Sequence, residues 1–157
     1  SNDANAHTIT FDNSVFHVFP ASLRSTYKVP NLAEPNNNWC GMFMLLGGGA
    51  DGWTAQECDL SSFDRLSFWV RAASDAGNPK RFKIELLFGT EGKAGFYVDT
   101  ITSSWQKMII PLSSLVGLDR SCIKQINIIY EREVIQSMDG STAGVLFFDE
   151  LQFEKAN

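Results

Sequence analysis

Leu66-Ser-Phe-Trp-Val-Arg-Ala72 is the stretch that most directly indicates how this chain folds. Its first, third and fifth residues are apolar and alternate with Ser67 and Trp69, the period of two that is typical of a β-strand with one face in a core. Two later stretches repeat this pattern, Ser104–Leu112 and Gly144–Phe153. Strands of this kind, spread along the chain, predict an all-β fold, an antiparallel β-sandwich.

Further strand candidates follow one another along the chain and leave no room for a long amphipathic helix. Together with those above they make about ten strands, which is typical of a jelly roll. The stretch Cys40–Leu46 is apolar on both faces, which predicts a central strand covered on both sides. The other candidates are Thr8–Phe11, Val15–Phe19, Ser25–Val29, Trp53–Asp59, Phe82–Phe88, Gly95–Ile101 and Ile123–Glu131, with a loop expected at Val134–Gly144.

The length and charge of the chain exclude several classes of protein. A chain of 157 residues predicts one domain, which we expect at residues 8–157 after a disordered or tag-like start at residues 1–7. No stretch approaches the roughly 18 apolar residues of a membrane span. The net charge is −5 and the basic residues are scattered, whereas nucleic-acid binding needs a positive patch. We therefore expect neither a membrane nor a nucleic acid as partner.

The residue patterns of common catalytic sites are missing from the sequence. The two histidines, His7 and His17, lie near the N-terminus without an evident Ser or Cys nucleophile to serve. The glycines at Gly47–Gly49 precede an expected strand rather than a helix, so they do not form a phosphate loop. Several carboxylates lie on or beside strands, either as a glycosidase pair or, as we favour, as solvated side chains. These carboxylates are Glu85, Asp99, Glu131 and Glu133. We therefore expect no enzymatic activity.

Three cysteines, Cys40, Cys58 and Cys122, are too few for a disulfide-rich scaffold or a zinc site. If the flanking stretches form a hairpin centred on Gly49, Cys40 faces Cys58 at a separation that a disulfide can bridge. The alternative is a pair of small buried thiols. The sequence leaves both open.

Aromatic residues beside loops are the most informative feature for function. A sugar ring has an apolar face and a polar rim, so an aromatic ring with polar neighbours matches both. Trp39, Trp53 and Tyr130 are candidates for such a platform, although each ring could equally belong to ordinary packing. Trp69 is expected on an outer face or under a loop, and Trp105 in the core or packed at a corner of the sandwich.

Several stretches resemble galactose-binding-like jelly-roll modules, and in particular the family-eleven carbohydrate-binding modules of glycoside hydrolases, which bind β-glucans. The resemblance covers most of the chain from Phe11 onward. The stretches that carry it are Asp51-Gly-Trp-Thr54, Asp59–Ala72, Ser103–Leu115, Ile123–Tyr130 and Phe147–Phe153.

This resemblance implies a site and a metal ion. A structural Ca²⁺ would be held by Asp12 and Asp149, since carboxylate oxygens are what that ion prefers. Trp53 and Tyr130 match aromatic residues of the family's ligand cleft. Asp119 and Arg120 match polar cleft residues, and Glu131 and Trp39 complete the expected ligand-binding set. Lys124 stands where the family has an acidic residue.

The expected function is thus a non-catalytic, extracellular or cell-surface module that binds a polysaccharide, such as a β-glucan or another plant cell-wall glycan, in a cleft on one sheet. We expect it to be part of a glycoside hydrolase or another multidomain protein. The same fold also resembles the intermediate-associated proteins of mitochondrial complex I, so a protein-interaction module is the alternative. A jelly-roll glycosidase or lyase is a third hypothesis. A sugar binder should expose two or more rings along one groove, and an interaction module a broad apolar patch.

Overall fold

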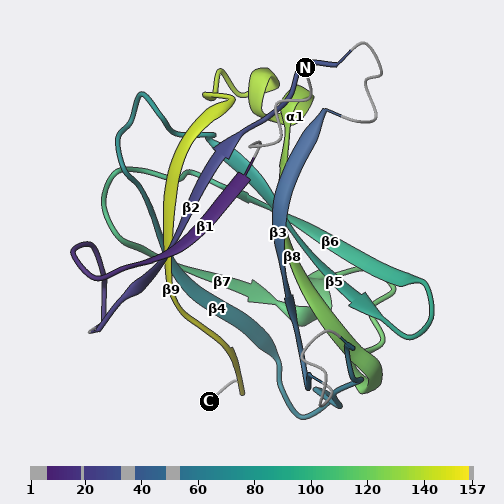
Figure 1. The fold of residues 1–157 in the computed structure, drawn as a ribbon. Helices are drawn as coiled ribbons and strands as arrows, with labels where there is room; N and C mark the ends of the chain where they lie inside the picture. The colour runs from purple at the N-terminus through teal and green to yellow at the C-terminus, as the bar shows by residue number, and fades with distance from the viewer. Residues whose placement is uncertain (1–6, 19, 33–37, 49–53, 156–157) are drawn as a thin grey trace.

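The computed structural model of the chain describes residues 7–18, 20–32, 38–48 and 54–155, which form two facing antiparallel sheets (Figure 1). The five-stranded sheet has the order β1 (His7–Asp12), β2 (Ser22–Lys28), β9 (Ala143–Glu154), β4 (Arg65–Ala72) and β7 (Gln106–Pro111). The four-stranded sheet has the order β3 (Trp39–Leu45), β8 (Ile123–Glu131), β5 (Arg81–Phe88) and β6 (Gly92–Asp99). The predicted all-β sandwich is confirmed.

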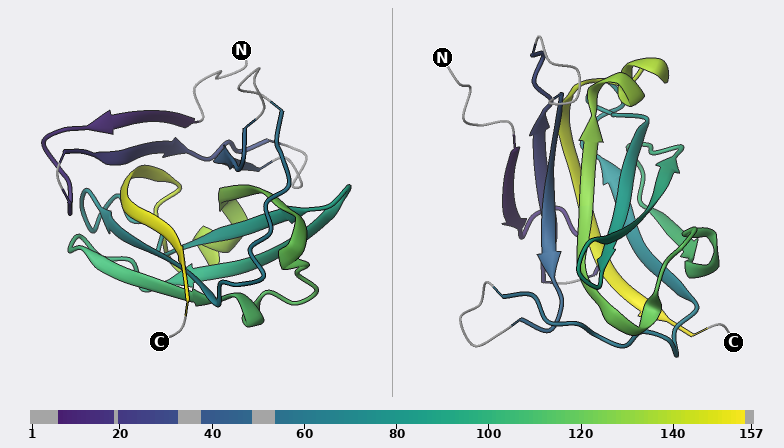
Figure 2. Two further views of the ribbon diagram at one scale, coloured as in Figure 1. Left: turned by 90° about the horizontal axis from the view of Figure 1, so that it is seen from below. Right: turned by 90° about the vertical axis from the view of Figure 1, so that its right-hand side faces the viewer.

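The two sheets face each other (Figure 2), and apolar side chains from their inner faces form the core between them. The opening stretch of the sequence is the central strand β4, and its Leu66, Phe68 and Val70 are fully buried, as the alternation predicts. The rings of Phe68 and Phe82 approach to 6.3 Å across the interface between the sheets. Burial of these side chains is the main stabilising term, since removing apolar surface from water is favourable.

In the described residues, short helices lie at the ends of strands: η2 (Leu112–Ser114), η3 (Arg120–Cys122) and α1 (Arg132–Ser137). The helix α1 occupies part of the expected loop at Val134–Gly144. Its Ile135 is fully buried, and this contact with the core explains why a stretch without strand periodicity is ordered as a helix. None of the helices in the described ranges has the length and apolar character needed to cross a membrane.

The hairpin expected between Cys40–Leu46 and Trp53–Asp59 is wrong. β3 pairs with β8, which places Cys40 opposite Tyr130, and all three cysteines are free. The described part of the second stretch is not a strand, and Cys58 contributes only an isolated bridge to Ile123. In a sandwich of this kind a strand often finds its partner far along the chain, which local spacing does not reveal.

The stretch Val15–Phe19 is also not a strand over its described residues, since residues 13–18 form a loop; Phe19 lies outside the described residues. This loop covers Trp69, whose indole stacks on the His17 ring with centroids 3.7 Å apart. Trp69 therefore lies under a loop, one of the two placements that its position allowed.

The prediction that β3 is covered on both faces is wrong, and this difference leads to the candidate site. Its inner side chains Cys40 and Met42 are buried, but Trp39 is 53% exposed and Phe43 is 56% exposed on the outer face. Large apolar rings on an open sheet face lower the solubility of a protein and require a functional explanation.

Candidate functional site

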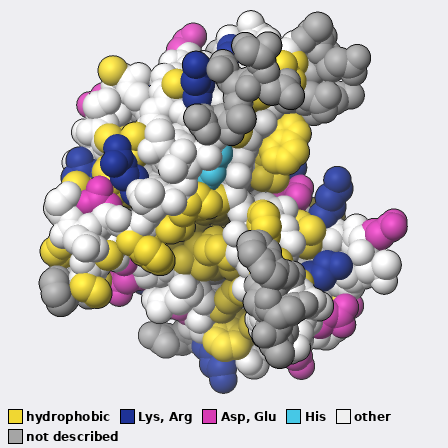
Figure 3. Space-filling view, in the orientation of Figure 1, with side chains coloured by type: hydrophobic (Ala, Val, Ile, Leu, Met, Phe, Trp, Pro, Cys, Tyr) yellow, Lys and Arg dark blue, Asp and Glu magenta, His cyan; other side chains and the backbone are white. Residues whose placement is uncertain are grey.

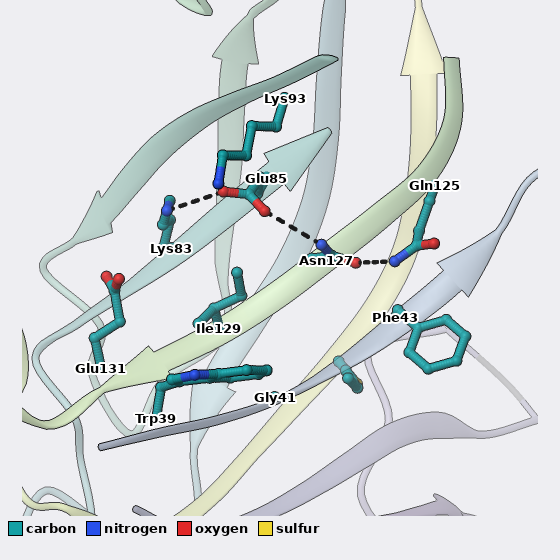
Figure 4. A pocket seen from close by; sticks show the side chains of 11 residues that line it. Trp39, Gly41, Phe43, Lys83, Glu85, Lys93, Gln125, Asn127, Ile129 and Glu131 are labelled. Atoms are coloured by element: carbon teal, nitrogen blue, oxygen red, sulfur yellow. Dashed lines mark hydrogen bonds and ion pairs between the residues drawn. The ribbon is translucent and has the colours of Figure 1, made fainter. Parts of the chain in front are cut away.

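The outer face of the four-stranded sheet carries a cleft of about 560 Å³ (Figure 4). Apart from Met42, its lining comes from residues that alternate with the core residues of the same strands, because successive side chains of a strand point to opposite faces. The residues that line it are Trp39, Gly41, Met42, Phe43, Lys83, Glu85, Lys93, Gln125, Asn127, Ile129 and Glu131.

Strand register arranges these residues in rows across the sheet. One row runs from Phe43 through Asn127 and Glu85 to Gly95. The next row runs from Gly41 through Ile129 and Lys83 to Tyr97, and Trp39 lies opposite Glu131 in the row beyond it.

Gly41 keeps the floor of the cleft low between the two aromatic rings of β3. A Cβ atom at this position would collide with the carbonyl oxygen of Ile128 on the neighbouring strand. The glycine therefore permits close pairing of β3 with β8 and also leaves the space between Trp39 and Phe43 open, as Figure 4 shows.

Two aromatic rings stand along the β3 side of the cleft. Trp39 and Phe43 are four residues apart on β3, which corresponds to about 13 Å along the strand. That separation exceeds the size of one sugar ring, so only an oligosaccharide or a polymer could contact both. Tyr97 on β6 is also exposed and lies on the far side of the same face.

A chain of polar contacts runs along the cleft beside Trp39 and Phe43 (Figure 4). The Gln125 amide donates to Asn127 Oδ1 at 2.6 Å, and Asn127 Nδ2 donates to Glu85 Oε1 at 3.4 Å. Glu85 also pairs with Lys83 through its second oxygen, at 3.0 Å from Nζ. These contacts hold the polar side chains in fixed positions before any ligand arrives, which lowers the ordering cost of binding.

Charges in the cleft are balanced and fixed by neighbours. Burial lowers the pKa of Lys83, but its hydrogen bond to Glu85 and the charges of Glu85 and Glu131 outweigh this effect, so that its pKa is raised. Glu131 accepts a hydrogen bond of 2.9 Å from the Tyr97 hydroxyl. Burial and this bond both raise the pKa of Tyr97. With Lys93 the lining contains two lysines and two glutamates, so the cleft suits an uncharged ligand.

Trp39 and Glu131 are the sequence-predicted site residues that the structure brings together in the cleft. Trp53 lies outside the described residues. Tyr130 is fully buried, stacks on Tyr27 at 4.4 Å and shares a 2.8 Å hydrogen bond with Ser25. The prediction that its ring stacks on a sugar is wrong, because its position on β8 directs it to the core while the next residue points to the cleft.

Asp119 and Arg120 do not line the cleft. Both residues precede β8, whereas Glu131 is its last residue. The nine residues of the strand place Asp119 and Arg120 about 26 Å from Glu131. Asp119 accepts hydrogen bonds from Ser121 at the start of η3, and Arg120 donates to the Phe63 carbonyl at 2.6 Å. Both side chains therefore hold the loop before β8 in place.

Sequence reasoning missed Phe43, Gly41, Lys83, Gln125 and Asn127 as cleft residues. It considered Glu85 as a glycosidase carboxylate or, preferably, a solvated side chain, but not as a ligand-binding residue. A signal was present, since the outward positions of Phe82–Phe88 include Lys83 and Glu85. Only the pairing of β5 and β3 with β8 shows that these positions share one surface.

The expected calcium ligands flank a loop instead of facing a shared position. Asp12 on β1 lies opposite Ser22 on β2, and Asp149 lies on β9, the next strand of the sheet. The two aspartates are therefore two strand spacings apart, about 9.5 Å. Asp12 Oδ1 accepts hydrogen bonds from the N–H groups of Ser14 and Val15, both at 2.9 Å. These bonds and, with the largest effect, the bond from the Ser14 hydroxyl lower the pKa of Asp12.

Asp149 Oδ2 accepts from the N–H groups of His17 and Val18, both at 2.8 Å. N–H groups cannot ligate a cation, and here they point at Asp12 Oδ1 and Asp149 Oδ2. No cluster of three or more His, Cys, Asp or Glu side chains suited to a metal occurs in the described part of the chain. Asp12 and Asp149, as placed, do not fit a shared ion, and calcium remains an untested prediction.

Comparison with known proteins gives likenesses of structure alone. No protein-family model matches the chain, and no curated protein does. A family 11 carbohydrate-binding module from Clostridium thermocellum, solved with a β-1,3-1,4-mixed-linked tetrasaccharide, is 16% identical with a TM-score of 0.67, over 96% of this chain and 83% of that one. A family 28 module specific for non-crystalline cellulose is 12% identical with a TM-score of 0.59, over 94% and 82%.

The fold also occurs as a part of larger enzymes. A β-1,2-glucanase from Parabacteroides distasonis is 15% identical with a TM-score of 0.61, and the match covers 98% of this chain but only 22% of the glucanase. The chain thus has the jelly-roll fold of carbohydrate-binding modules, as the sequence resemblance implies.

Proposed function

We propose that this chain is a non-catalytic carbohydrate-binding module that holds a polysaccharide in the cleft of the four-stranded sheet. One observation carries the proposal: Trp39 and Phe43 stand exposed in line along β3, with a row of fixed polar side chains beside them. Two rings along one groove are what distinguishes a sugar binder from a protein-interaction module with a broad apolar patch.

Binding follows from the amphipathic character of a sugar ring. The C–H faces of two sugar units pack on the Trp39 and Phe43 rings, which removes apolar surface from water. Hydroxyl groups on the rims of the sugars then replace water at Asn127, Glu85 and Glu131. Because these groups are held by neighbouring side chains, they select a hydroxyl pattern instead of adapting to any ligand.

The structural neighbours support a glycan as ligand and a multidomain context. Their ligands include a mixed-linked β-glucan and non-crystalline cellulose, and other neighbours are enzymes of which this fold is a small part. We infer that the ligand is a β-glucan or another plant cell-wall glycan. We also infer an extracellular or cell-surface location and attachment to a glycoside hydrolase or another multidomain protein.

The contacts of the cleft carboxylates favour binding over cleavage. A glycosidase needs one carboxyl as proton donor and a second as base or nucleophile. Glu85 is engaged by Lys83 and Asn127, and Glu131 by Tyr97. Both carboxylates are thus arranged as hydrogen-bond acceptors for hydroxyl groups.

Affinity gel electrophoresis tests the proposal with mixed-linked β-glucan, xylan, galactomannan and hydroxyethyl cellulose in separate gels. We expect at least one polysaccharide to retard the protein, and Trp39→Ala and Phe43→Ala each to weaken binding about tenfold, or about 1.4 kcal/mol. Val116→Ala is the matched control, because Val116 is an exposed apolar residue outside the cleft. Unchanged mobility with every polysaccharide would contradict the proposal and favour a protein-interaction module. Release of reducing sugar would contradict the non-catalytic role.

A further inference from the structure

Gly95 lies in the middle of β6, on the outer face of the four-stranded sheet. Its neighbours Ala94 and Phe96 pack against the core, so alternation places position 95 on the same face as the cleft. A glycine inside a strand weakens it, because glycine loses more conformational freedom on folding and has no side chain to pack. Such a glycine is typical of a place where another group approaches the backbone closely.

The backbone around Gly95 does not require a glycine. A Cβ atom at this position would lie 3.7 Å from the Ile84 carbonyl oxygen, an ordinary van der Waals distance, and the φ angle of Gly95 is not positive. Gly41 on β3 differs, because a Cβ atom there would collide with the Ile128 carbonyl oxygen. The reason for a glycine at position 95 therefore lies in a neighbouring side chain.

That side chain belongs to Lys83. A Cβ atom at position 95 would lie 2.7 Å from Lys83 Cε, which is closer than two such carbon atoms can approach. The strand register places Glu85 opposite Gly95 and Tyr97 opposite Lys83, so Lys83 reaches the diagonal position on β6. The end of the Lys83 side chain thus lies on β6 over Gly95.

This course brings the Lys83 ammonium group to Glu85. Nζ lies 3.0 Å from Glu85 Oε2, and the two side chains are only 22% and 12% exposed although they lie on an open sheet face. Basic and acidic side chains are interspersed on this side of the molecule, as the right of Figure 3 shows over β5 and β6. A pair that is largely withdrawn from water is screened less than an exposed one, so Lys83 holds the Glu85 carboxylate in place.

We propose that Gly95 is a positioning residue of the glycan cleft. Because it has no side chain, Lys83 lies along β6 with its ammonium group on Glu85, which fixes that carboxylate as an acceptor for a sugar hydroxyl and keeps the end of Lys83 out of the cleft. Any larger residue at position 95 displaces the end of Lys83 and separates the ion pair. Since this role concerns glycan binding, it rests on the function proposed above.

Gly95→Ala should weaken binding without weakening the fold. Only the flexible end of Lys83 has to move, and alanine restricts the unfolded chain more than glycine does. The melting temperature of the variant should therefore equal or exceed that of the wild type. Its dissociation constant for a polysaccharide should rise about tenfold, because Glu85 loses the partner that positions it.

A double-mutant cycle tests whether Gly95 acts through Lys83. Isothermal titration is carried out with whichever of the four polysaccharides retards the wild type most. Lys83→Ala should itself weaken binding, but it removes the atoms that a Cβ at position 95 would meet, so the addition of Gly95→Ala should cause no further loss. Gly48→Ala is the matched control and should bind like the wild type, since no described atom lies within 4 Å of a Cβ there.

Two results of the titration would overturn the proposal. One is wild-type affinity of Gly95→Ala. The other is an equal loss from Gly95→Ala in the presence and absence of the Lys83 side chain, since Gly95 would then act on the ligand directly or through the fold.

Acetylation by acetic anhydride at neutral pH tests the placement of Lys83 without any glycan. Mass spectrometry should show Lys83 reacting about threefold faster or more in Gly95→Ala, because the released amine is more exposed and more of it is neutral. Lys107, on the other sheet, should react at the same rate in both proteins. An unchanged Lys83 rate would overturn the proposal even if the glycan affinity fell. A wild type that no polysaccharide retards would instead contradict the function proposed above and, with it, a role of Gly95 in binding.

Discussion

The rings of Tyr27 and Tyr130 stack in the core with their centroids 4.4 Å apart and their planes 10° from parallel. The Tyr130 hydroxyl is 2.8 Å from Ser25 Oγ, and burial raises the pKa of Tyr130 far above its usual range. This contact joins β8 of one sheet to β2 of the other. It shows that Tyr130 stabilises the sandwich from inside, although it precedes a cleft residue in the sequence.

Tyr130→Phe should destabilise the protein by about 1 kcal/mol, because the stack remains while one buried hydrogen bond is lost. Urea denaturation followed by tryptophan fluorescence measures this change. Retention on a polysaccharide should stay at the wild-type level, with Trp39→Ala as the comparison that loses it. Weaker retention of a folded Tyr130→Phe variant would return Tyr130 to the binding site.

Asn127→Ala should weaken glycan binding about tenfold, or about 1.4 kcal/mol, because Asn127 positions both Gln125 and Glu85 in the cleft. Isothermal titration with the polysaccharide identified by electrophoresis measures the effect. Gln136→Ala is the matched control, since its amide is exposed on α1 outside the cleft. Equal affinities of the two variants would show that the polar row has no part in binding.

Glu154 should make the stability of the sandwich dependent on acid pH. Hydrogen bonds lower the pKa of Glu154 from the ordinary value of 4.5 to about 2. The bond from Ser67 has the largest effect, followed by the one from Lys107 and others that include Arg65. A depressed carboxyl pKa stabilises the folded state fully above the unfolded-state value, and this contribution is lost as pH falls from 4.5 towards 2.

Thermal melts of the wild type and of Glu154→Gln between those pH values measure this dependence. We expect the wild type to lose stability steadily over the interval and the variant to lose less. Parallel curves for the two proteins would rule out the carboxylate as the source of the acid sensitivity.

Removal of divalent ions should leave the melting temperature unchanged. The carboxylates of Asp12 and Asp149 accept hydrogen bonds from N–H groups of the loop at residues 13–18, so the loop is held without a cation. Melting with a chelator and with added Ca²⁺ gives the measurement, since an ion that binds only the folded state raises the transition. A rise with Ca²⁺ that the chelator reverses would support the calcium prediction.

Local periodicity was sufficient to predict the sandwich, and β4 and β8 begin and end close to the positions that alternation indicates. The positions of Trp39 and Glu131 in the cleft were also expected from the sequence, because an aromatic ring and a carboxylate beside loops match the apolar face and the polar rim of a sugar. The alternation of β5 separated Lys83 and Glu85 from its buried residues in the same way.

Tertiary structure alone decided which faces meet. Alternation along a strand shows which side chains share a face. It does not show which face points to the core or which strand lies beside it. Tyr130 therefore had two equivalent placements in the sequence, and only the pairing of β8 between β3 and β5 turned it inward. The cleft exists because Phe43, Asn127 and Glu85, which are about 40 positions apart or more in the sequence, became neighbours on three strands through backbone hydrogen bonding.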